Sequence, residues 1–408
     1  MTQISIAAGH SIPSRRKLAL QLGAATLARI FLNTARRFAY PFAPALSRGL
    51  SVPLTAITSL LAANQVTGLL SPFFGPLSDR WGYRVMMLAG LILLSGGMLA
   101  GGLLPVYSVV MLSLFLAGLG KSIFDPALQA YVGEKVPYQR RGLAIGAVEF
   151  SWAGSSLLGI PLIGLLINRA GWRSPFFALG VLGLASAIGL GILIPQEHRQ
   201  RQIGVRQTGL REAWLLLKQN RTVLSALAFG VLISMANDNL FVVYGAWLEK
   251  DFGLSIVMLG TVTLIIGLAE LLGEALTAAI ADRIGLKRAV LAGLGLSTSS
   301  YILLPGLGKS LPLALAGLFM TFITFEFTIV TAFSLFTELV PGARATMMSA
   351  STASTSLGRV AGALIGGPVW LAGGLAATGI LSAGISGLAL LCLLWGLRGW
   401  RAGEGVAN

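Results

Sequence analysis

The sequence predicts an all-α membrane protein whose twelve transmembrane helices form two pseudo-symmetric six-helix bundles. Its composition, a series of long apolar runs and an internal repeat support this fold class. Of the 408 residues, 55% are hydrophobic and only 11% are charged, and the mean hydropathy is +0.80. A soluble domain usually has about a quarter of its residues charged. A chain so poor in charge is expected to lie largely in lipid.

Twelve apolar runs are long enough to cross a bilayer, which takes about 20 apolar residues of helix. The first six predicted spans cover residues 18–46, 53–77, 85–104, 106–131, 143–167 and 175–195. The second six cover residues 223–248, 256–280, 289–308, 311–337, 345–370 and 374–397. A polar, basic segment separates the two sets. The predicted division is an N-terminal half at 1–195, a central loop at 196–222 and a C-terminal half at 223–408.

The two halves repeat the same motifs at a constant offset. Residues 79–84 read Asp-Arg-Trp-Gly-Tyr-Arg, and residues 282–287 read Asp-Arg-Ile-Gly-Leu-Lys. Residues 134–137 (Glu-Lys-Val-Pro) likewise recur at 338–341 as Glu-Leu-Val-Pro. Transporters built from two related halves bind substrate near the membrane midplane, between the repeats. The repeat therefore predicts a site between the halves.

The segment 75–84, Gly-Pro-Leu-Ser-Asp-Arg-Trp-Gly-Tyr-Arg, resembles the signature loop of the major facilitator superfamily of transporters. In that family Gly-x-Leu-Ala-Asp-Arg-x-Gly-Arg-Lys joins helices 2 and 3, and a weaker copy joins helices 8 and 9. The resemblance covers the chain from about Leu18 to Leu397. It implies a secondary transporter that works by alternating access.

Among the subtypes of that family, the pattern is most similar to exporters of the drug:proton antiporter or sugar-efflux type. Residues 154–164 partly match the Gly-x-x-x-Gly-Pro-x-x-Gly-Gly element of helix 5, with an isoleucine inserted before the proline. Drug:proton antiporters usually carry Arg-x-x-Gln-Gly on helix 4. Here Leu114 and Ala117 stand at the Arg and Gln positions before Gly118, so the proton relay of that motif does not carry over.

Basic residues predict the orientation, because loops rich in Lys and Arg stay in the cytoplasm. If both termini are cytoplasmic, that side carries 20 Lys and Arg residues and the opposite side carries five. The expected location is the plasma (inner) membrane, as a multi-pass protein with both termini inside. The expected partners are a small-molecule substrate, protons and the lipid bilayer, and the expected state is a monomer.

Several function classes are disfavoured. The net charge of +15 is spread over short loops rather than gathered in a basic patch, which argues against nucleic-acid binding. Cys392 is the only cysteine, and His10 and His198 lie outside the apolar runs, so the sequence predicts neither a disulfide nor a metal site. It also lacks a Gly-x-x-x-x-Gly-Lys-Ser/Thr motif for ATP. We therefore expect no cofactor and no enzymatic activity.

Ionisable residues inside the spans point to the site, because a charge at the bilayer centre costs about 2.5–3.5 kcal/mol on insertion scales. The predicted spans contain eleven: Arg29, Arg36, Arg37, Lys121, Arg359, Asp125, Glu149, Asp238, Glu270, Glu274 and Glu326. The structural alternative for each is a buried ion pair that fixes helix register. Asp238 and Glu326 lie near the middle of their spans, as Arg359 does, and are therefore candidates for pairing with it.

Three sets of residues are assigned roles. The predicted substrate-binding residues are Asn33, Arg36, Arg37, Tyr40, Asn237, Asp238, Tyr244, Glu326 and Arg359. The predicted proton-coupling residues are Glu270, Glu274 and Asp238, since two carboxylates one turn apart cannot both ionise at low cost. The predicted gating residues are Asp79, Arg80, Lys121, Asp125, Glu149, Asp282 and Arg283.

The leading functional hypothesis is proton-coupled efflux of a small amphiphilic or drug-like compound. An alternative is exchange or uptake of an anionic metabolite or lipid headgroup, with Arg36, Arg37 and Arg359 as an anion clamp. Two hypotheses from other functional classes are a passive channel and a membrane-embedded enzyme. The two-fold repeat disfavours the channel, and the lack of a metal set or nucleophile motif disfavours the enzyme.

Overall fold

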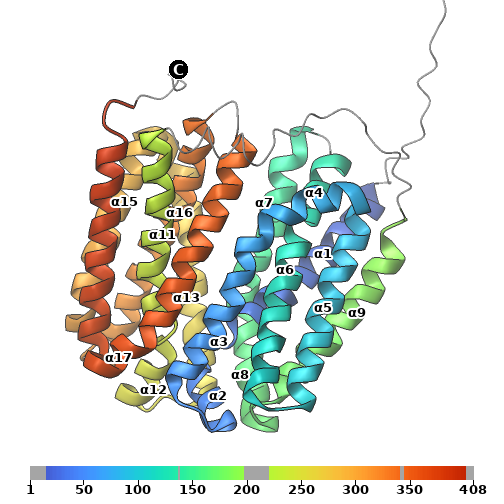
Figure 1. Cartoon of the computed structure of the whole chain (residues 1–408), viewed down its shortest axis with the longest axis horizontal. Helices are drawn as coiled ribbons and strands as arrows, with labels where there is room; N and C mark the ends of the chain where they lie inside the picture. Colours follow the sequence, from blue (N-terminus) through green and yellow to red (C-terminus); the bar gives the residue numbers. More distant parts are fainter. Residues whose placement is uncertain (1–14, 137, 197–219, 341–343, 401–408) are drawn as a thin grey trace, which may run out of the picture.

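The computed structural model describes residues 15–136, 138–196, 220–340 and 344–400, and within these ranges the chain forms helices and turns without strands (Figure 1). Most of the predicted central loop lies outside the described residues. The same is true of His10, His198 and the proline of each Glu-x-Val-Pro repeat.

The N-terminal half supplies six membrane-crossing segments, three of which are built from more than one helix. In chain order the elements are α1 (Arg15–Arg37), α2 (Ala43–Leu50), α3 (Leu54–Val66), η1 (Thr67–Leu70), α4 (Ser71–Trp81), α5 (Tyr83–Leu103), α6 (Tyr107–Lys135), α7 (Tyr138–Gly154), the π-helical η2 (Ser155–Gly159), α8 (Ile160–Ala170) and α9 (Ser174–Leu193). The pairs α1 with α2, α3 with α4, and α7 with α8 each form one predicted span.

The C-terminal half repeats this plan. Its elements are α11 (Arg221–Phe241), α12 (Tyr244–Phe252), α13 (Ile256–Leu276), the π-helical η3 (Thr277–Ala281), α14 (Asp282–Ile284), α15 (Leu286–Leu307), α16 (Leu311–Leu339) and α17 (Arg344–Gly396). The 53 residues of α17 exceed twice the length needed to cross a bilayer. Its backbone leaves helical geometry at Gly373 and Gly374, so α17 contains the last two spans.

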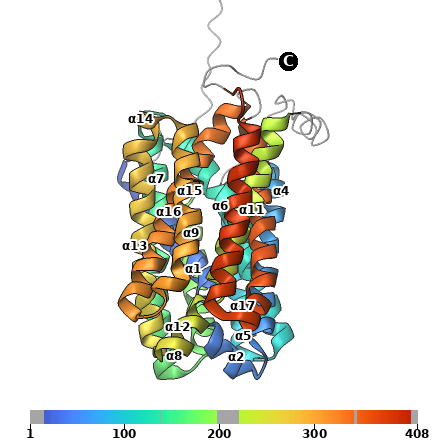
Figure 2. The ribbon, with the colours of Figure 1, turned by 90° about the vertical axis from the view of Figure 1, so that its left-hand side faces the viewer.

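The described part of the chain contains eleven helical segments long and apolar enough to cross a membrane, and the break in α17 raises the number of spans to twelve. The predicted all-α fold of two six-helix bundles is therefore confirmed. Figure 1 shows the N-terminal helices, blue to green, beside the C-terminal helices, yellow to red. Turned by 90°, the helices still run roughly parallel to one another (Figure 2).

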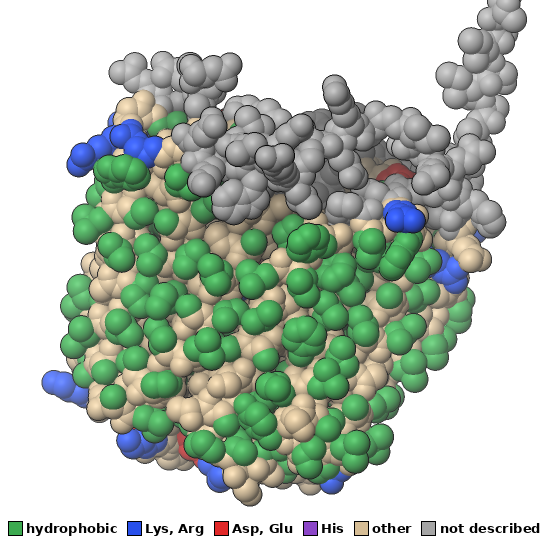
Figure 3. Space-filling model, viewed as in Figure 1, with side chains coloured by type: hydrophobic (Ala, Val, Ile, Leu, Met, Phe, Trp, Pro, Cys, Tyr) green, Lys and Arg blue, Asp and Glu red, His purple; other side chains and the backbone are tan. Residues whose placement is uncertain are grey.

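The outer surface fits a lipid environment. On the face shown in Figure 3, hydrophobic side chains cover the middle, and Lys and Arg gather toward the upper and lower edges. Large apolar side chains such as Ile192 (78% exposed) and Ile380 (68% exposed) point outward. In water such a surface would be an aggregation hazard. In a bilayer it is the expected boundary with lipid.

The described chain begins and ends at one edge of the bundle, which we call the terminal face, and α2 and α12 lie at the opposite edge, the distal face (Figure 1). At the distal face the two halves are in contact. Arg48 of α2 and Glu249 of α12 form an ion pair of 2.8 Å, and Gly245 packs against the backbone of Pro41. A pocket of about 310 Å³ lies over this joint. The interface between the halves is called the seam below.

A glycine ridge brings α17 against α11. A Cβ atom on Gly362 would lie 2.6 Å from the carbonyl oxygen of Met235 and 2.9 Å from Cβ of Asp238. Gly358 and Gly366, one turn away on either side, also face the α11 backbone closely. Small residues allow such backbone contact in lipid, where van der Waals packing holds helices together. This ridge sets the depth at which Asp238 lies beside the span that carries Arg359.

Candidate substrate and coupling site at the seam

A buried ion pair crosses the seam near its centre. Arg37, at the end of α1, donates to both carboxylate oxygens of Glu270 on α13, at 3.1 Å and 2.6 Å. The exposed fraction is 3% for Arg37 and 5% for Glu270. Two parallel N–H···O bonds make this the strong, geometrically specific form of the arginine–carboxylate interaction. The pair therefore ties the N-terminal half to the C-terminal half.

The π-helical segment η2 supplies a third contact to this pair. The hydroxyl of Ser156 donates to Glu270 at 3.2 Å, and a Cβ atom on Gly267 would lie 2.7 Å from Cβ of Ser156. The guanidinium of Arg37 lies over the ring of Trp152, 4.3 Å from its centroid. One-turn π-helical segments occur often at functional sites, where they change the direction of side chains. Here such a segment faces Ser156 toward the carboxylate.

A second polar connection crosses the seam beside the first. The hydroxyl of Tyr40 donates to Asp238 of α11 at 3.1 Å and accepts from the side-chain amide of Gln65 at 2.5 Å. The carbonyl oxygen of that amide accepts from Arg36. Both Tyr40 and Asp238 are fully buried. The chain Arg36–Gln65–Tyr40–Asp238 thus runs from the N-terminal half into the C-terminal half.

Sequence reasoning missed Gln65 and Ser156. Gln65 is uncharged and so is not among the ionisable residues of the spans, although a buried amide needs a hydrogen-bond partner. Ser156 lies in a run of small residues that looks like a packing surface. The signal in each case was an uncharged polar side chain within a predicted span, the same signal that marked Asn33 and Asn237.

Glu270 pairs with Arg37 and not with Arg359. Arg359 is half-buried and makes no ion pair with any described residue, so the suggested pairs with Asp238 and Glu326 are also not formed. Arg36, in the N-terminal half, also forms no ion pair with a described residue. One arginine in each half is therefore without an ion-pair partner among the described residues.

Two further acids of the C-terminal spans, Glu326 and Glu274, lie near Glu270. Glu326 of α16 is 9% exposed, and its Cβ would lie 2.8 Å from a Cβ atom on Gly273. Glu274 is half-buried one turn beyond Glu270. Neither glutamate forms an ion pair or side-chain hydrogen bond with a residue that the structure describes. Both remain candidates for binding a proton or a cationic group.

The other predicted substrate-binding residues are buried but take different partners. Asn33 donates to Ser151 at 3.2 Å, within the N-terminal half. Asn237 and Tyr244 lie on the C-terminal side, and the side-chain oxygen of each is buried without a hydrogen-bond partner in the described chain. The ring of Tyr244 stacks on Phe241 with centroids 5.4 Å apart. Unpartnered buried oxygens of this kind are available to a ligand.

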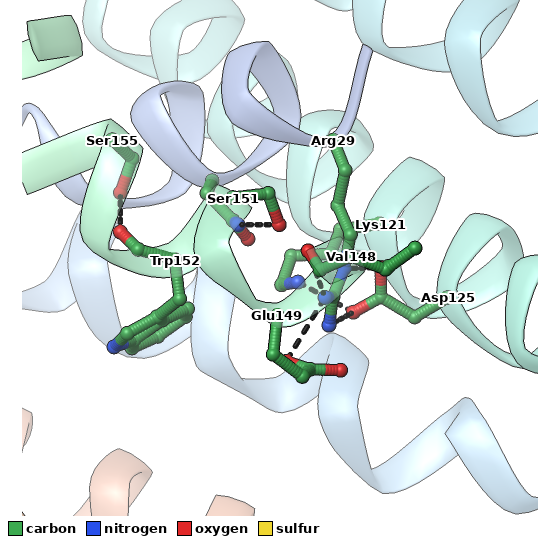
Figure 4. Close-up of polar contacts among 9 residues, drawn as sticks. Arg29, Lys121, Asp125, Val148, Glu149, Ser151, Trp152 and Ser155 are labelled. Atoms are coloured by element: carbon green, nitrogen blue, oxygen red, sulfur yellow. Dashed lines mark hydrogen bonds and ion pairs between the residues drawn. The ribbon is translucent and has the colours of Figure 1, made fainter. Parts of the chain in front are cut away.

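Three predicted gating residues form a cluster with Arg29 (Figure 4). Arg29 of α1 contacts Asp125 of α6 at 3.0 Å and Glu149 of α7 at 2.9 Å. Lys121 contacts the same aspartate at 2.5 Å. Two cations and two anions make the cluster neutral. It joins α1, α6 and α7 within the N-terminal half and does not cross the seam.

The signature loop is not part of this cluster as the structure describes it. Arg80 and Arg283 are exposed near the ends of α4 and α14. The side chains of Asp79 and Asp282 lie outside the description. The predicted gate network that would include residues 79 and 80 therefore stays a prediction.

Comparison with known proteins places the chain in a family. Residues 25–243 and 227–404 each match the Major Facilitator Superfamily. An uncharacterized MFS-type transporter of Bacillus subtilis, YceJ, is 27% identical over 72% of this chain and 74% of its own length. The multidrug resistance protein MdtG of Escherichia fergusonii is 28% identical over 59% of this chain and 58% of its own length.

The solved structures agree on the fold. A bacterial homolog of the human lysosomal transporter Spinster, crystallised in an inward-facing and unoccupied conformation, superposes with a TM-score of 0.71 over 95% of this chain and 96% of that one, at 16% identity. The two matched ranges overlap at residues 227–243 and together cover nearly the whole chain. The protein is thus a multi-pass membrane transporter that belongs to the Major Facilitator Superfamily.

Proposed function

We propose that this transporter couples proton movement to the efflux of a small amphiphilic or drug-like compound. The observation that carries the proposal is the buried Arg37–Glu270 pair, which joins the two halves across the seam. Alternating access requires the halves to separate and rejoin on each side of the membrane in turn. A contact between them that one proton can weaken supplies a physical link between protonation and that motion.

The proposed mechanism uses Glu270 as the proton carrier. Protonation removes the negative charge that binds Arg37, while Ser156 can keep its hydrogen bond to the neutral acid. The contact across the seam weakens, and the halves separate more easily. When the proton leaves, the pair forms again and draws the halves together. Each chain contains both sides of this contact, so a monomer is sufficient for the cycle.

The proposed direction of transport and substrate class are supported by a relative and by the side chains at the seam. MdtG, a relative covering 59% of the chain, is named a multidrug resistance protein, which favours efflux of drug-like compounds. Apolar ring surfaces meet across the seam, with Tyr40 and Phe241 at a centroid separation of 4.4 Å, and such surfaces suit an amphiphile. Exchange or uptake of an anionic compound is the second candidate, because Arg36 and Arg359 have no ion-pair partner among the described residues.

A pH gradient across proteoliposomes tests the coupling. Vesicles with an acidic lumen should accumulate a fluorescent amphiphile from a substrate panel, because an antiporter exchanges outgoing protons for entering substrate. Addition of a protonophore should abolish this accumulation, and protein-free vesicles give the background. Accumulation in an alkaline lumen instead would favour coupled uptake. Equal transport with and without a gradient, for every compound that crosses, would contradict the proposal.

We also propose that both termini lie in the cytoplasm at the plasma membrane, on the basis of the 20-to-5 distribution of Lys and Arg. Cysteines introduced at Gln202 and Ser310, with Cys392 replaced by alanine, should react with a membrane-impermeant maleimide from opposite sides. In intact cells the Ser310 position is expected to label and the Gln202 position to label only after lysis. Labelling of both from outside would contradict this topology.

A further inference from the structure

We infer that Arg36 and Arg359 form an anion-binding site at the seam, which selects amphiphiles that carry a carboxylate or phosphate group. The inference deepens the proposed function and rests on it, since it names the charge of the transported compound. Arg36 belongs to the first span and Arg359 to the eleventh, so a single anion would contact both halves.

The position of Arg36 is fixed by its neighbours. Its Nη2 atom donates to Gln65 and lies 3.7 Å from the place where a Cβ atom on Gly68 would be. The same Cβ position is in contact with the hydroxyl of Ser356 on α17. Ser356 lies one helical turn before Arg359, so the guanidinium of Arg36 faces the stretch of α17 that carries Arg359.

Both guanidiniums have donors to spare. The Nε atom of Arg36 is buried without a hydrogen-bond partner in the described chain. Arg359, half-buried, makes no hydrogen bond or ion pair with any described residue. A guanidinium offers five N–H donors arranged to hold a carboxylate or phosphate. Buried donors without an acceptor are costly, and a bound oxyanion would satisfy them.

The charges at this point are unbalanced. Arg36 and Arg359 are like charges on facing stretches of the first and eleventh spans, and no carboxylate lies within ion-pair distance of either residue among those described. Asp238 of α11 accepts a hydrogen bond from Tyr40 and forms no ion pair with either guanidinium. Both positive charges therefore have no counter-ion at ion-pair distance among the described residues. A neutral or cationic compound would leave the repulsion in place.

The hydroxyl of Ser356 lies beside the same space. It is 4% exposed and donates to no described residue, whereas Ser354 and Thr355 donate to backbone carbonyls of their own helix. An oxyanion held by Arg36 and Arg359 could accept a further hydrogen bond from Ser356. One anionic group would thus contact two guanidiniums, from Arg36 and Arg359, and one neutral hydroxyl donor, from Ser356. The apolar tail of the compound would lie along the rest of the seam.

The test compares three fluorescent probes of the same shape, measured by equilibrium binding to the full-length protein in nanodiscs. The probes are dansyl-undecanoate, its methyl ester and the corresponding trimethylammonium compound, and empty nanodiscs correct for partition into lipid. We expect the carboxylate to bind about tenfold tighter or more than the ester, because hydrogen bonds to charged groups are the stronger kind. Dodecyl phosphate should displace it. Equal affinity for acid and ester would overturn the inference.

Arg359→Gln should remove most of the preference for the acid without unfolding the protein, because the change relieves a repulsion and leaves no partner unpaired. Arg359→Lys should keep part of the preference. The exposed Arg169, changed to Gln, is the matched control and should keep all of it. Retention of the full preference in a folded Arg359→Gln variant would overturn the inference. These binding measurements need no pH gradient. The anion site can therefore be disproved while proton-coupled transport is still observed, and proton coupling can be disproved while the preference for the acid is still observed.

Discussion

Replacement of Glu270 by Gln is expected to abolish transport driven by a pH gradient while exchange of substrate across the membrane continues. The reason lies in the contact that Glu270 makes. Its carboxylate is the only group seen to bind Arg37 as an ion pair within the described chain. A glutamine can accept only through its single carbonyl oxygen, because its amide nitrogen donates. It also cannot gain or lose a proton, so the link between protonation and movement of the halves is lost.

The variant also leaves the charge of Arg37 buried without its counter-ion. Removal of one partner from a buried pair typically costs about 3–5 kcal/mol. Loss of coupling must therefore be separated from loss of folding. The double variant Arg37→Gln with Glu270→Gln removes both charges and should recover melting temperature and exchange activity. It should not recover gradient-driven transport.

Glu274→Gln is the matched control for this experiment, since Glu274 lies one turn further along the same span. It is half-buried and makes no ion pair with a described residue. Its replacement should leave stability unchanged. If the coupling acid is Glu270, gradient-driven transport also survives in this variant. Full gradient-driven transport in both single variants would exclude span 8 as the proton site and make Asp238 or Glu326 the next candidates.

Asp125→Asn is expected to destabilise the N-terminal half by about 3–5 kcal/mol, the usual cost of leaving buried charge unpaired. Asp125 serves two cations at once, Arg29 at 3.0 Å and Lys121 at 2.5 Å. After the change, Glu149 is the only acid left to balance both of them within the cluster (Figure 4). Thermal unfolding in detergent should show a clear fall in melting temperature.

The activities distinguish this structural role from a gating role. A structural aspartate, once neutralised, should reduce exchange and gradient-driven transport together, in proportion to the folded protein that remains. Asp251→Asn is a suitable control, because it makes the same chemical change at an exposed aspartate that forms no ion pair with a described residue. A folded Asp125→Asn protein that binds substrate but cycles slowly would instead support the predicted gate.

The sequence by itself determined the number and order of the spans, because the length of an apolar run is a local property with a fixed physical requirement. It also determined which residues had to be buried. The spacing along the first span predicts one stripe facing the protein interior, made of Arg29, Asn33, Arg36, Arg37 and Tyr40. Four of the five are 5% exposed or less, and Arg36 is half-buried. The glycines at 358, 362 and 366 recur at every fourth position, a spacing that favours a close-packing ridge, and α11 packs against them.

Only the tertiary structure decided which charges meet. Arg37 and Glu270 are 233 positions apart in sequence, and nothing local distinguishes Glu270 paired with Arg37 from Glu270 paired with Arg359. The choice depends on how far each helix is rotated and shifted along its axis against its neighbours. A π-helical turn such as η2 changes that rotation by a fraction of a turn, enough to place Ser156 on the carboxylate. Interactions across the seam arise from the packing of whole helices, and so the partners of Arg37, and the lack of one for Arg359, appear only in the folded molecule.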